Sequence, residues 1–514
     1  MTTTLEVTRK SLILNLGDSH FTILHRAGLA GLWMTLAQLE REGVAPPEGL
    51  TWELTPQQVS LKWAGHDKTA LDWLLRESFQ LKDGLICLRG LDSGSMRLDV
   101  QVVLHQGMLG TFLQHPSTRK AEGKRDVILK LDEDDKELKV SYLALQSYVH
   151  TAFAESLCDK KGEVLTKPLN VAGWLNPGAT VKHIAFSADT GFKESAVGAF
   201  VLLFAPVACG YYLLRSQLRG QRAQFALVIP DVQDLECYSR YRNDTSLRNA
   251  SYKDFQASSL GDAGLQFLTY EQASERFAQN YHIPRCQVIT LGSVVWASQQ
   301  KTRTDLFVIE ADHKTCQQYR TCRSFLDDRT VQGKEGNFIA HSFAREIITE
   351  NLARGLPWYN GFAKRITSND LFKKLTFERG GLHQMIQHIE WDNQAERLFV
   401  QACHEAIRYT YGQIAEQAKN RNEVPNFDRE TVRIRTGLGR CKTSQLFREF
   451  ITDFFARAGK VPTLQEHWRE LINLITGKDW SKARDLALLA LASYKGKETE
   501  GMKALETEDD EIMP

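Results

Sequence analysis

Apolar residues in the first two thirds of the chain follow both strand-like and helical spacing. The apolar run 12–16 ends at a Gly-Asp turn pair, which predicts a short strand. Strict alternation of apolar and polar residues predicts strands over 98–104, 127–131 and 138–140, and the acidic segment 132–135 reads as a hairpin tip. Similar reasoning predicts a helix around 29–36 and further strands at 225–229, 288–296 and 306–309.

Beyond Gly333 the spacing becomes helical. Apolar residues recur at three- and four-residue steps from Ile339 to Leu352, and Gly355 and Pro357 are expected to end that helix. From His383 onward four helices are predicted, the size of a four-helix bundle. They are centred on 391–409, 447–455, 463–475 with a capping box at Thr463 and Glu466, and 479–496.

This pattern predicts an α+β fold in several parts. Residues 1–332 read as a mixed α/β body with β-hairpins, and 333–382 as a helical connector. Residues 383–496 read as the all-α C-terminal bundle. The segment 497–514 is rich in acids and is expected to be a disordered tail.

Composition narrows the class of protein. The 514 residues carry 64 Lys+Arg against 63 Asp+Glu, a net charge of +1, which excludes a histone-like or strongly acidic protein. The first residues contain no apolar run, so no signal peptide is expected. The nine cysteines include no pair separated by two residues, which favours a reducing compartment and a cytoplasmic location.

One uncharged segment, 195–214, is long enough to cross a membrane. It contains Gly198, Pro206 and Gly210, and no second segment of this kind accompanies it. A buried core segment is therefore favoured, because buried strands and helices can also be continuously apolar. Membrane insertion stays open as the alternative.

Catalytic motifs fail on inspection. The segment 437–443 resembles a phosphate loop, but Cys441 stands directly before Lys442 where the loop needs glycine. His66-Asp67 reads as an ordinary surface pair, and the adjacent Cys403 and His404 are expected to point in different directions on a helix. No catalytic residue, metal ligand or cofactor is assigned. A nuclease whose carboxylates are scattered along the sequence remains the alternative from a different class.

Two basic clusters suit contact with phosphate. One comprises Arg119, Lys120, Lys124 and Arg125, between two predicted strands. The other lies between predicted bundle helices, where Gly437 and Gly439 are expected to keep the backbone mobile. Its cations are Arg429, Arg433, Arg435, Arg440, Lys442 and Arg448, against Glu430 alone. On pattern alone, a solvated surface is the favoured explanation of either cluster.

Four segments resemble a known family. They are Leu16–Leu36, which contains His-Arg-Ala-Gly-Leu-Ala-Gly-Leu, then Leu-Phe-Ala-Pro-Val-Ala-Cys at 203–209, Val-Ile-Pro-Asp at 228–231, and Asn-Leu-Ala-Arg-Gly-Leu-Pro-Trp-Tyr at 351–359. The chain is similar through these segments to the large subunit of type I CRISPR surveillance complexes, in the subtype I-B branch often called Myxan.

The resemblance implies a soluble, non-catalytic subunit at the foot of a ribonucleoprotein, near the 5′ end of the guide RNA. Such a subunit reads a protospacer-adjacent motif in double-stranded DNA, promotes unwinding and R-loop formation, and contacts the displaced strand through its helical bundle. Its expected partners are the guide CRISPR RNA, the target DNA, the backbone and foot subunits and small-subunit bundles. A helicase-nuclease would then act in defence, or transposition proteins in RNA-guided insertion, and nothing in the chain separates these two fates.

Nucleic-acid contacts are assigned by charge. We expect Lys120, Lys124 and Arg125 near the DNA motif or the guide. A second set, Arg433, Arg435, Arg440 and Lys442, is expected on the displaced strand.

Met385 is the one methionine between positions 108 and 502, and it lies at the start of the predicted bundle. Related I-B systems make a separate small subunit from an internal start in the large-subunit gene. Met385 is therefore a candidate start, with a plain core methionine as the alternative.

Overall fold

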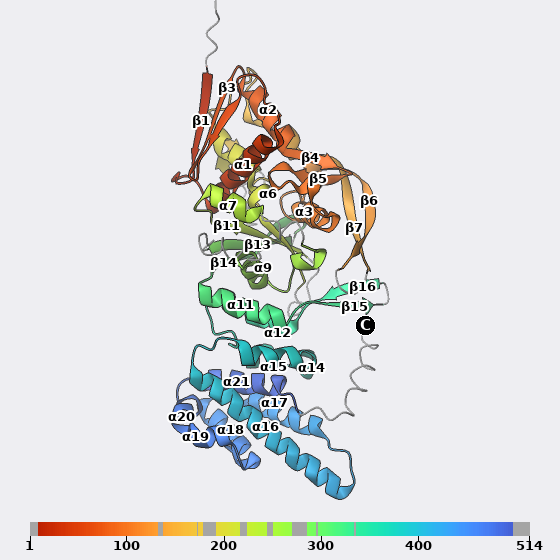
Figure 1. The fold of residues 1–514 in the computed structure, drawn as a ribbon, viewed down its shortest axis with the longest axis vertical. Coiled ribbons are helices and arrows are strands. Elements are labelled where there is room, and N and C mark those ends of the chain that lie inside the picture. Colours follow the sequence, from red (N-terminus) through yellow and green to blue (C-terminus); the bar gives the residue numbers. More distant parts are fainter. Residues whose placement is uncertain are drawn as a thin grey trace, which may run out of the picture. The chain divides into compact units, whose positions relative to one another are not determined.

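The structure is a computed structural model that describes residues 9–131, 137–171, 173–177, 192–215, 224–243, 250–269, 285–294, 297–333 and 336–496. The chain forms two compact units (Figure 1). Unit 1 comprises residues up to 312 together with 330–339, and unit 2 comprises 313–329 and the chain from 340 onward. Unit 1 mixes small sheets with helices and unit 2 is helical, which confirms the predicted α+β class.

Two sheets organise unit 1. The first is antiparallel, with the order β1 (Arg9–Asn15), β3 (Gln58–Ala64) and β2 (Thr51–Leu54). The second has five strands in the order β12–β10–β11–β13–β14. Their bounds are Gln256–Ala257, Gly210–Leu214, Gln224–Pro230, Arg285–Val294 and Ala297–Glu310. These confirm the strands predicted at 225–229 and 306–309; of the one predicted at 288–296, residues 295–296 lie outside the described residues.

Helices cover both faces of the five-stranded sheet. Tyr211 of β10 packs against Gly107 of α3 (Leu98–Gly110), while the neighbouring Gly210 packs against Phe267 of α9 (Leu260–Leu268). Because successive strand residues point to opposite faces, α3 and α9 lie on opposite sides of the sheet. The other helices of unit 1 are α1 (Ile23–Glu42), α2 (Asp67–Ser78), α4 (Ala154–Leu157), α5 (Ala196–Leu203), α6 (Ala205–Ala208) and α7 (Leu235–Arg242).

Four further strand pairs complete unit 1. The longest is β6 (Arg119–Lys130) with β7 (Glu137–Tyr148), an antiparallel pair that confirms the strands predicted at 127–131 and 138–140. Its predicted acidic tip, 132–135, lies outside the described residues. The others are β4–β5 (Phe79–Lys82, Leu85–Leu88), β8–β9 (Leu169–Asn170, Lys193–Glu194) and β15–β16 (Arg329–Gly333, Gly336–Ala340).

The strand predicted over 98–104 was wrong, because these residues form the first half of α3. Val100, Val102, Val103 and Leu104 are all buried, so the helix is enclosed on most sides and shows no polar face. An enclosed helix loses the 3.6-residue polar period, and its β-branched residues then imitate a strand. Tertiary packing therefore overrides the local pattern.

The uncharged segment 195–214 forms α5, α6 and β10, and it is buried in unit 1. This confirms the predicted core segment. Among the described residues, no helix has both the length and the hydropathy needed to cross a membrane. His66-Asp67 corrects another prediction, because Asp67 is buried and accepts hydrogen bonds from Trp63 Nε1 and Val164 N, both at 2.9 Å.

Unit 2 is built from successive helices. They are α11 (His313–Phe325), α12 (Phe343–Ala353), α13 (Phe362–Arg365), α14 (Asn369–Phe377), α15 (Arg379–His388), α16 (Gln394–Arg421), α17 (Phe427–Arg440), α18 (Ser444–Ala458), α19 (Pro462–Glu466), α20 (Trp468–Thr476) and α21 (Trp480–Ser493). Helix α21 is buried from Ala483 to Ser493 and packs against α15, α16 and α17, so it forms the centre of the bundle. Gly355, at φ 65°, ends the α12 turn as predicted.

Two details of the predicted bundle were wrong. The segment expected as a mobile loop is the helix α17, which buries only Ile434 and Leu438 and so shows a weak apolar stripe. The helix predicted at 463–475 is divided at His467 into α19 and α20. Thr463 lies inside α19, where its backbone N–H and hydroxyl both donate to the Glu405 carboxylate of α16, at 2.9 and 2.7 Å.

Candidate nucleic-acid interface

The N-terminal basic cluster lies on β6. Lys120 and Lys124 are exposed, and the Arg125 guanidinium donates to the Glu122 carboxylate and to the carbonyl of Asp83, both at 2.8 Å. Arg119 is half-buried, and burial lowers the pKa of its guanidinium. Its Nη1 is buried without a hydrogen-bond partner within the described part of the chain. Among the described residues, the hairpin thus presents two exposed lysines, Lys120 and Lys124, beside Arg119, which forms no ion pair there.

His105 of α3 fixes this hairpin to the rest of unit 1. Its Nδ1 accepts from the backbone N–H of Ile86 at 3.1 Å, and its Nε2 donates to the carbonyl of Leu143 in β7 at 2.8 Å. Burial lowers the pKa of His105 to about 4, so the ring is neutral at pH 7 and keeps this tautomer. A neutral ring with both nitrogens bonded holds β7 against α3 and β5.

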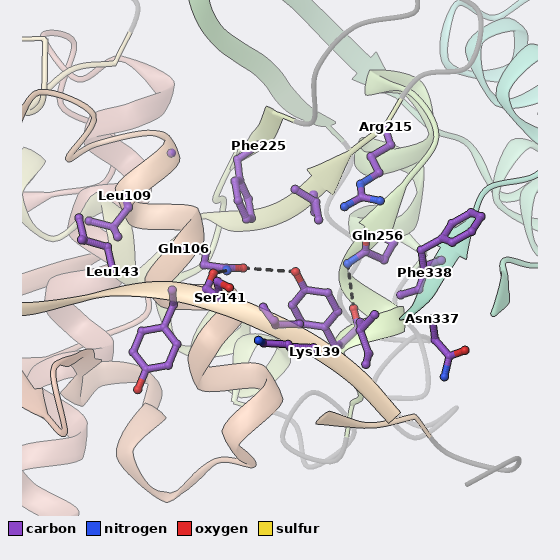
Figure 2. Close-up of a pocket in the computed structure, with 17 residues that line it drawn as sticks. Gln106, Leu109, Lys139, Ser141, Leu143, Arg215, Phe225, Gln256, Asn337 and Phe338 are labelled. Atoms are coloured by element: carbon purple, nitrogen blue, oxygen red, sulfur yellow. Dashed lines mark hydrogen bonds between the residues drawn. The ribbon is translucent and has the colours of Figure 1, made fainter. Parts of the chain in front are cut away.

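A pocket of about 520 Å³ lies beside the hairpin within unit 1 (Figure 2). The end of α3, strand β7, the edge of the five-stranded sheet and β16 contribute its walls. Its lining combines aromatic rings, side-chain amides and two cations. These are Tyr142, Phe225, Tyr252 and Phe338, then Gln106, Gln256 and Asn337, then Lys139 and Arg215.

The second cluster lies on α17 and just beyond it. With 3.6 residues per turn, Arg429, Arg433 and Arg440 fall within about 40° of one another around the helix axis. Arg429, Arg440 and Lys442 are exposed. Arg433 donates from Nε and Nη2 to the Glu430 carboxylate, at 2.8 and 2.5 Å. Arg435 points to another side of the helix, so the structure brings together three arginines of this cluster and leaves Arg435 apart.

The segment expected to be mobile is a helix, α17, that packs against the rest of the bundle. A Cβ on Gly437 would lie 2.1 Å from the Phe450 ring of α18, so this glycine permits close helix packing. Arg484 of α21 donates from Nη1 to the carbonyl of Cys441 at 2.8 Å, and its guanidinium lies over the Trp480 ring. These contacts fix the end of α17 on the bundle core.

Two of the segments that resemble the known family, 16–36 and 203–209, lie side by side in unit 1. On α1, a Cβ on Gly28 would lie 2.3 Å from the carbonyl oxygen of Val201, and one on Gly31 would lie 2.0 Å from that of Phe204. The glycines therefore let α1 contact the backbone of the 195–214 segment directly. The segments on which the family resemblance rests therefore determine how α1 packs against α5 and α6.

Ion pairs connect the segment 16–36 to other parts of unit 1. The Arg26 guanidinium lies 2.9 Å from the buried Asp231 carboxylate, which Arg285 also contacts. His25 Nε2 lies 3.2 Å from the Glu194 carboxylate, and burial, opposed by Glu194, lowers the pKa of His25. The segments 16–36, 203–209 and 228–231 thus help to hold unit 1 together, whereas 351–359 belongs to unit 2, and none of the four lies in the basic clusters.

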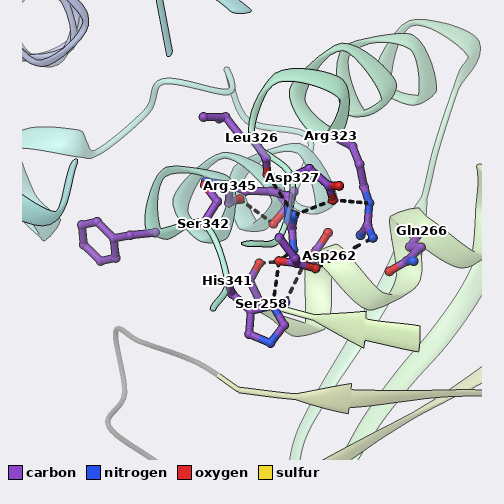
Figure 3. Close-up of polar contacts among 12 residues, drawn as sticks. Ser258, Asp262, Gln266, Arg323, Leu326, Asp327, His341, Ser342 and Arg345 are labelled. Atoms are coloured by element: carbon purple, nitrogen blue, oxygen red, sulfur yellow. Dashed lines mark hydrogen bonds and ion pairs between the residues drawn. The ribbon is translucent and has the colours of Figure 1, made fainter. Parts of the chain in front are cut away.

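A buried polar cluster plays the same structural role in unit 2 (Figure 3). Arg345 is fully buried; its Nη2 contacts the Asp328 carboxylate at 2.5 Å and its Nη1 donates to the carbonyl of Leu326 at 2.9 Å. His341 Nδ1 lies 2.8 Å from the same Asp328 carboxylate. Burial alone would raise the pKa of Asp328, but Arg345 and His341 hold it below its usual value.

The other residues considered as catalytic or metal-binding candidates have structural roles. His404 Nε2 lies 3.0 Å from the Ser493 hydroxyl, and burial raises the pKa of the Cys403 thiol, so the two side chains do not form a dyad. Within the residues that the structure describes, no three His, Cys, Asp or Glu side chains are grouped to hold a metal ion.

Sequence reasoning missed the pocket. Gln106, Arg215, Tyr252 and Phe338 lie far apart in the chain, and none belongs to a charged run or a recognisable motif. The one sequence signal is Arg215, the first charge after the uncharged segment 195–214.

Comparison with known families covers both units. A DevT N-terminal domain matches residues 13–203, and a DevT C-terminal domain matches residues 387–513. The two matches stand in the order of their names, with the DevT N-terminal domain before the DevT C-terminal domain. Together with the relative described next, they support the class of Cas8-like large subunits of CRISPR systems.

A full-length relative agrees. The chain is 29% identical over 525 aligned residues to the CRISPR-associated protein Cas8a1/Csx13 of Myxococcus xanthus (strain DK1622). The alignment covers 95% of this chain and 89% of that protein.

Proposed function

We propose that this chain is the non-catalytic large subunit of an RNA-guided type I-B, Myxan-like CRISPR surveillance complex in the cytoplasm. It recognises a protospacer-adjacent motif in double-stranded DNA, promotes unwinding and stabilises the displaced strand. The observation that carries the proposal is the similarity to Cas8a1/Csx13 along nearly the whole chain. The basic surfaces on β6 and α17 give that role a physical basis.

The division of labour follows from the energetics of strand exchange. Pairing with the guide reads the DNA sequence, and the heteroduplex is about as stable as the duplex it replaces. A few cationic contacts with the displaced strand are then enough to favour the open state. We assign these contacts to Arg433, Arg440 and Lys442, and we keep Arg435, which lies on a different side of α17, as a separate contact.

The β6 cluster is assigned to the motif end of the complex. Lys120 and Lys124 are exposed and free to reach phosphate, whereas Arg125 must exchange its contact with Glu122 for one with nucleic acid. Phosphate contacts of this kind position a protein on nucleic acid without reading bases. The partners are the guide RNA, the target DNA, the other subunits of the complex, and either a helicase-nuclease or transposition proteins.

Neutralising the α17 face is expected to weaken the hold on the displaced strand. In the assembled complex, the triple variant Arg433→Gln, Arg440→Gln, Lys442→Gln should reduce the salt dependence of R-loop stability. Each lost single-strand phosphate contact lowers the log–log slope by about 0.7, so about 2 for the set. The measurement is R-loop dissociation at several salt concentrations.

The matched control removes the same charge elsewhere in unit 2. Lys373, Lys374 and Lys478 are exposed and lie outside α17, and their change to Gln should leave the slope nearly unaltered. Equal effects of the two triple variants would refute a specific role for the α17 face.

Met385 is proposed as the start of a separate small subunit. The DevT C-terminal match begins just beyond it, at residue 387, which supports a domain boundary here. In the structure Met385 is fully buried within α15, so the short product would keep α16–α21 whole and begin inside that helix.

Changing Met385 to Leu is expected to abolish the short product while leaving the full chain folded. Leu replaces Met in a buried position at a cost below about 1.5 kcal/mol. Immunoblotting through a C-terminal tag detects both products. Met108→Leu, at another fully buried helical methionine, is the control. A short product that persists in Met385→Leu would show that this start is not used.

A further inference from the structure

We infer that the 520 Å³ pocket of unit 1 binds one unstacked nucleotide of a single strand, with its base among the aromatic side chains and its phosphate at Arg215. This inference rests on the proposed nucleic-acid role of the chain. It adds a defined subsite that neither basic cluster contains. The pocket volume falls within the range of small-molecule sites.

The aromatic side chains supply a stacking surface. Phe338 of β16 is 41% exposed, and the Phe225 ring of β11 is half-buried in the pocket wall. Tyr252 is largely buried and donates its hydroxyl to Gln106 Oε1 at 3.3 Å. Proteins that bind single strands stack unpaired bases on side chains of this kind. An exposed ring at the rim of a cavity that also has aromatic walls fits a base better than a flat surface contact does.

Side-chain amides belong to the lining of the pocket, and hydrogen bonds to backbone carbonyls hold two of them in place (Figure 2). Gln106 donates from Nε2 to the carbonyl of Ser141 at 3.0 Å, and Asn337 donates from Nδ2 to the carbonyl of Glu137 at 2.9 Å. Each amide nitrogen carries two N–H donors, and the second one of each has no partner within the described residues. An amide held by one N–H presents the other in a defined direction.

The charge around the pocket favours an anion. Lys139 and Arg215 line it, and its described lining includes no Asp or Glu. Lys139 contacts the Asp126 carboxylate at 2.8 Å, so its charge is largely compensated. Arg215 is exposed, and within the described residues its side chain forms no hydrogen bond or ion pair. An arginine without a carboxylate partner at the edge of a polar cavity is suited to phosphate.

These features together select a nucleotide over an apolar peptide side chain. A peptide side chain would use the rings but would leave the oriented amides and the Arg215 charge without partners. A nucleotide uses all three. The strand can be DNA or the guide RNA, since the base and phosphate chemistry is shared.

The test uses the full chain and fluorescently labelled single strands of equal length. One is DNA, one is RNA, and one is a sugar-phosphate strand without bases. Phe338→Ala should weaken binding of the base-bearing strands about 5- to 100-fold, the range for loss of one base stack, and leave the abasic strand unaffected. Arg215→Gln should weaken all three. A preference for RNA or for DNA identifies the source of the nucleotide.

Matched controls are Phe377→Ala, at another exposed phenylalanine, and Lys62→Gln, at an exposed cation of β3. Equal binding of base-bearing and abasic strands by the wild-type chain would overturn the pocket inference and leave the proposed function standing. An unchanged affinity in Phe338→Ala would overturn it too. Failure of both the chain and its complex to bind any strand would overturn the proposed function itself.

Discussion

Replacing Gly31 with alanine is expected to destabilise unit 1 by about 3 kcal/mol. The new Cβ would lie 2.0 Å from the carbonyl oxygen of Phe204, which belongs to backbone between two buried helices. Such an atom cannot move alone, so α1 must shift away from α5 and α6. The shift would also disturb the contact between Arg26 and Asp231. Denaturant or thermal unfolding of the full chain measures the loss.

Gly412→Ala is the control for this substitution. Gly412 also lies inside a helix, α16, but nothing stands within 4 Å of its added Cβ. Alanine there should stabilise the protein by about 1 kcal/mol, because glycine has the poorer helix propensity. If Gly31→Ala proved as harmless as Gly412→Ala, close contact between α1 and the 195–214 segment would be refuted.

Replacing Arg345 with methionine is expected to cost unit 2 about 3–5 kcal/mol at neutral pH. The substitution removes the charge that faces the buried Asp328 carboxylate and the donor to the carbonyl of Leu326. Methionine fills most of the space, so the cost comes mainly from a buried Asp328 charge that keeps only His341, at 2.8 Å, and the more distant Arg323, at 3.9 Å, beside it. Unfolding of the variant and of the wild type, measured across pH, separates charge from packing.

The pH dependence of this deficit has a defined sign. In the wild type the pKa of Asp328 is depressed, so its contribution to stability is present above the unfolded-state pKa of about 3.9 and is lost as the pH falls below it. In Arg345→Met burial raises that pKa, and protonation relieves the buried charge. The difference between variant and wild type should therefore shrink from pH 7 toward pH 4. A deficit independent of pH would indicate a packing defect instead.

Periodicity predicted those elements that have one buried and one exposed face. The β6–β7 hairpin shows this, because Leu129, Leu138 and Val140 are buried while Lys124 and Ile128 are exposed. Helix α3 escaped prediction since burial on most sides erased its period. Helix α17 was not predicted for the opposite reason. It buries only Ile434 and Leu438, and two buried residues are too few to form an apolar stripe among so many arginines.

Part of the candidate site could be predicted from the sequence and part could not. Runs of cations are visible in a sequence, so both basic clusters were predicted, although the pairing of Arg433 with Glu430 was not. The pocket depends on tertiary structure, which brings Gln106, Arg215, Tyr252 and Asn337 together from separate elements. Close approach of α1 to the 195–214 segment likewise becomes visible only when the carbonyls facing Gly28 and Gly31 are known.

The central claim is that this chain works as the large subunit of an RNA-guided complex. The most direct test is a pull-down through a C-terminal tag, with the neighbouring genes and a CRISPR array co-expressed, followed by mass and nucleic-acid analysis of the eluate. We predict a guide-sized RNA and several partner subunits in defined ratio with the chain. Recovery of the chain alone, free of RNA, would contradict the account.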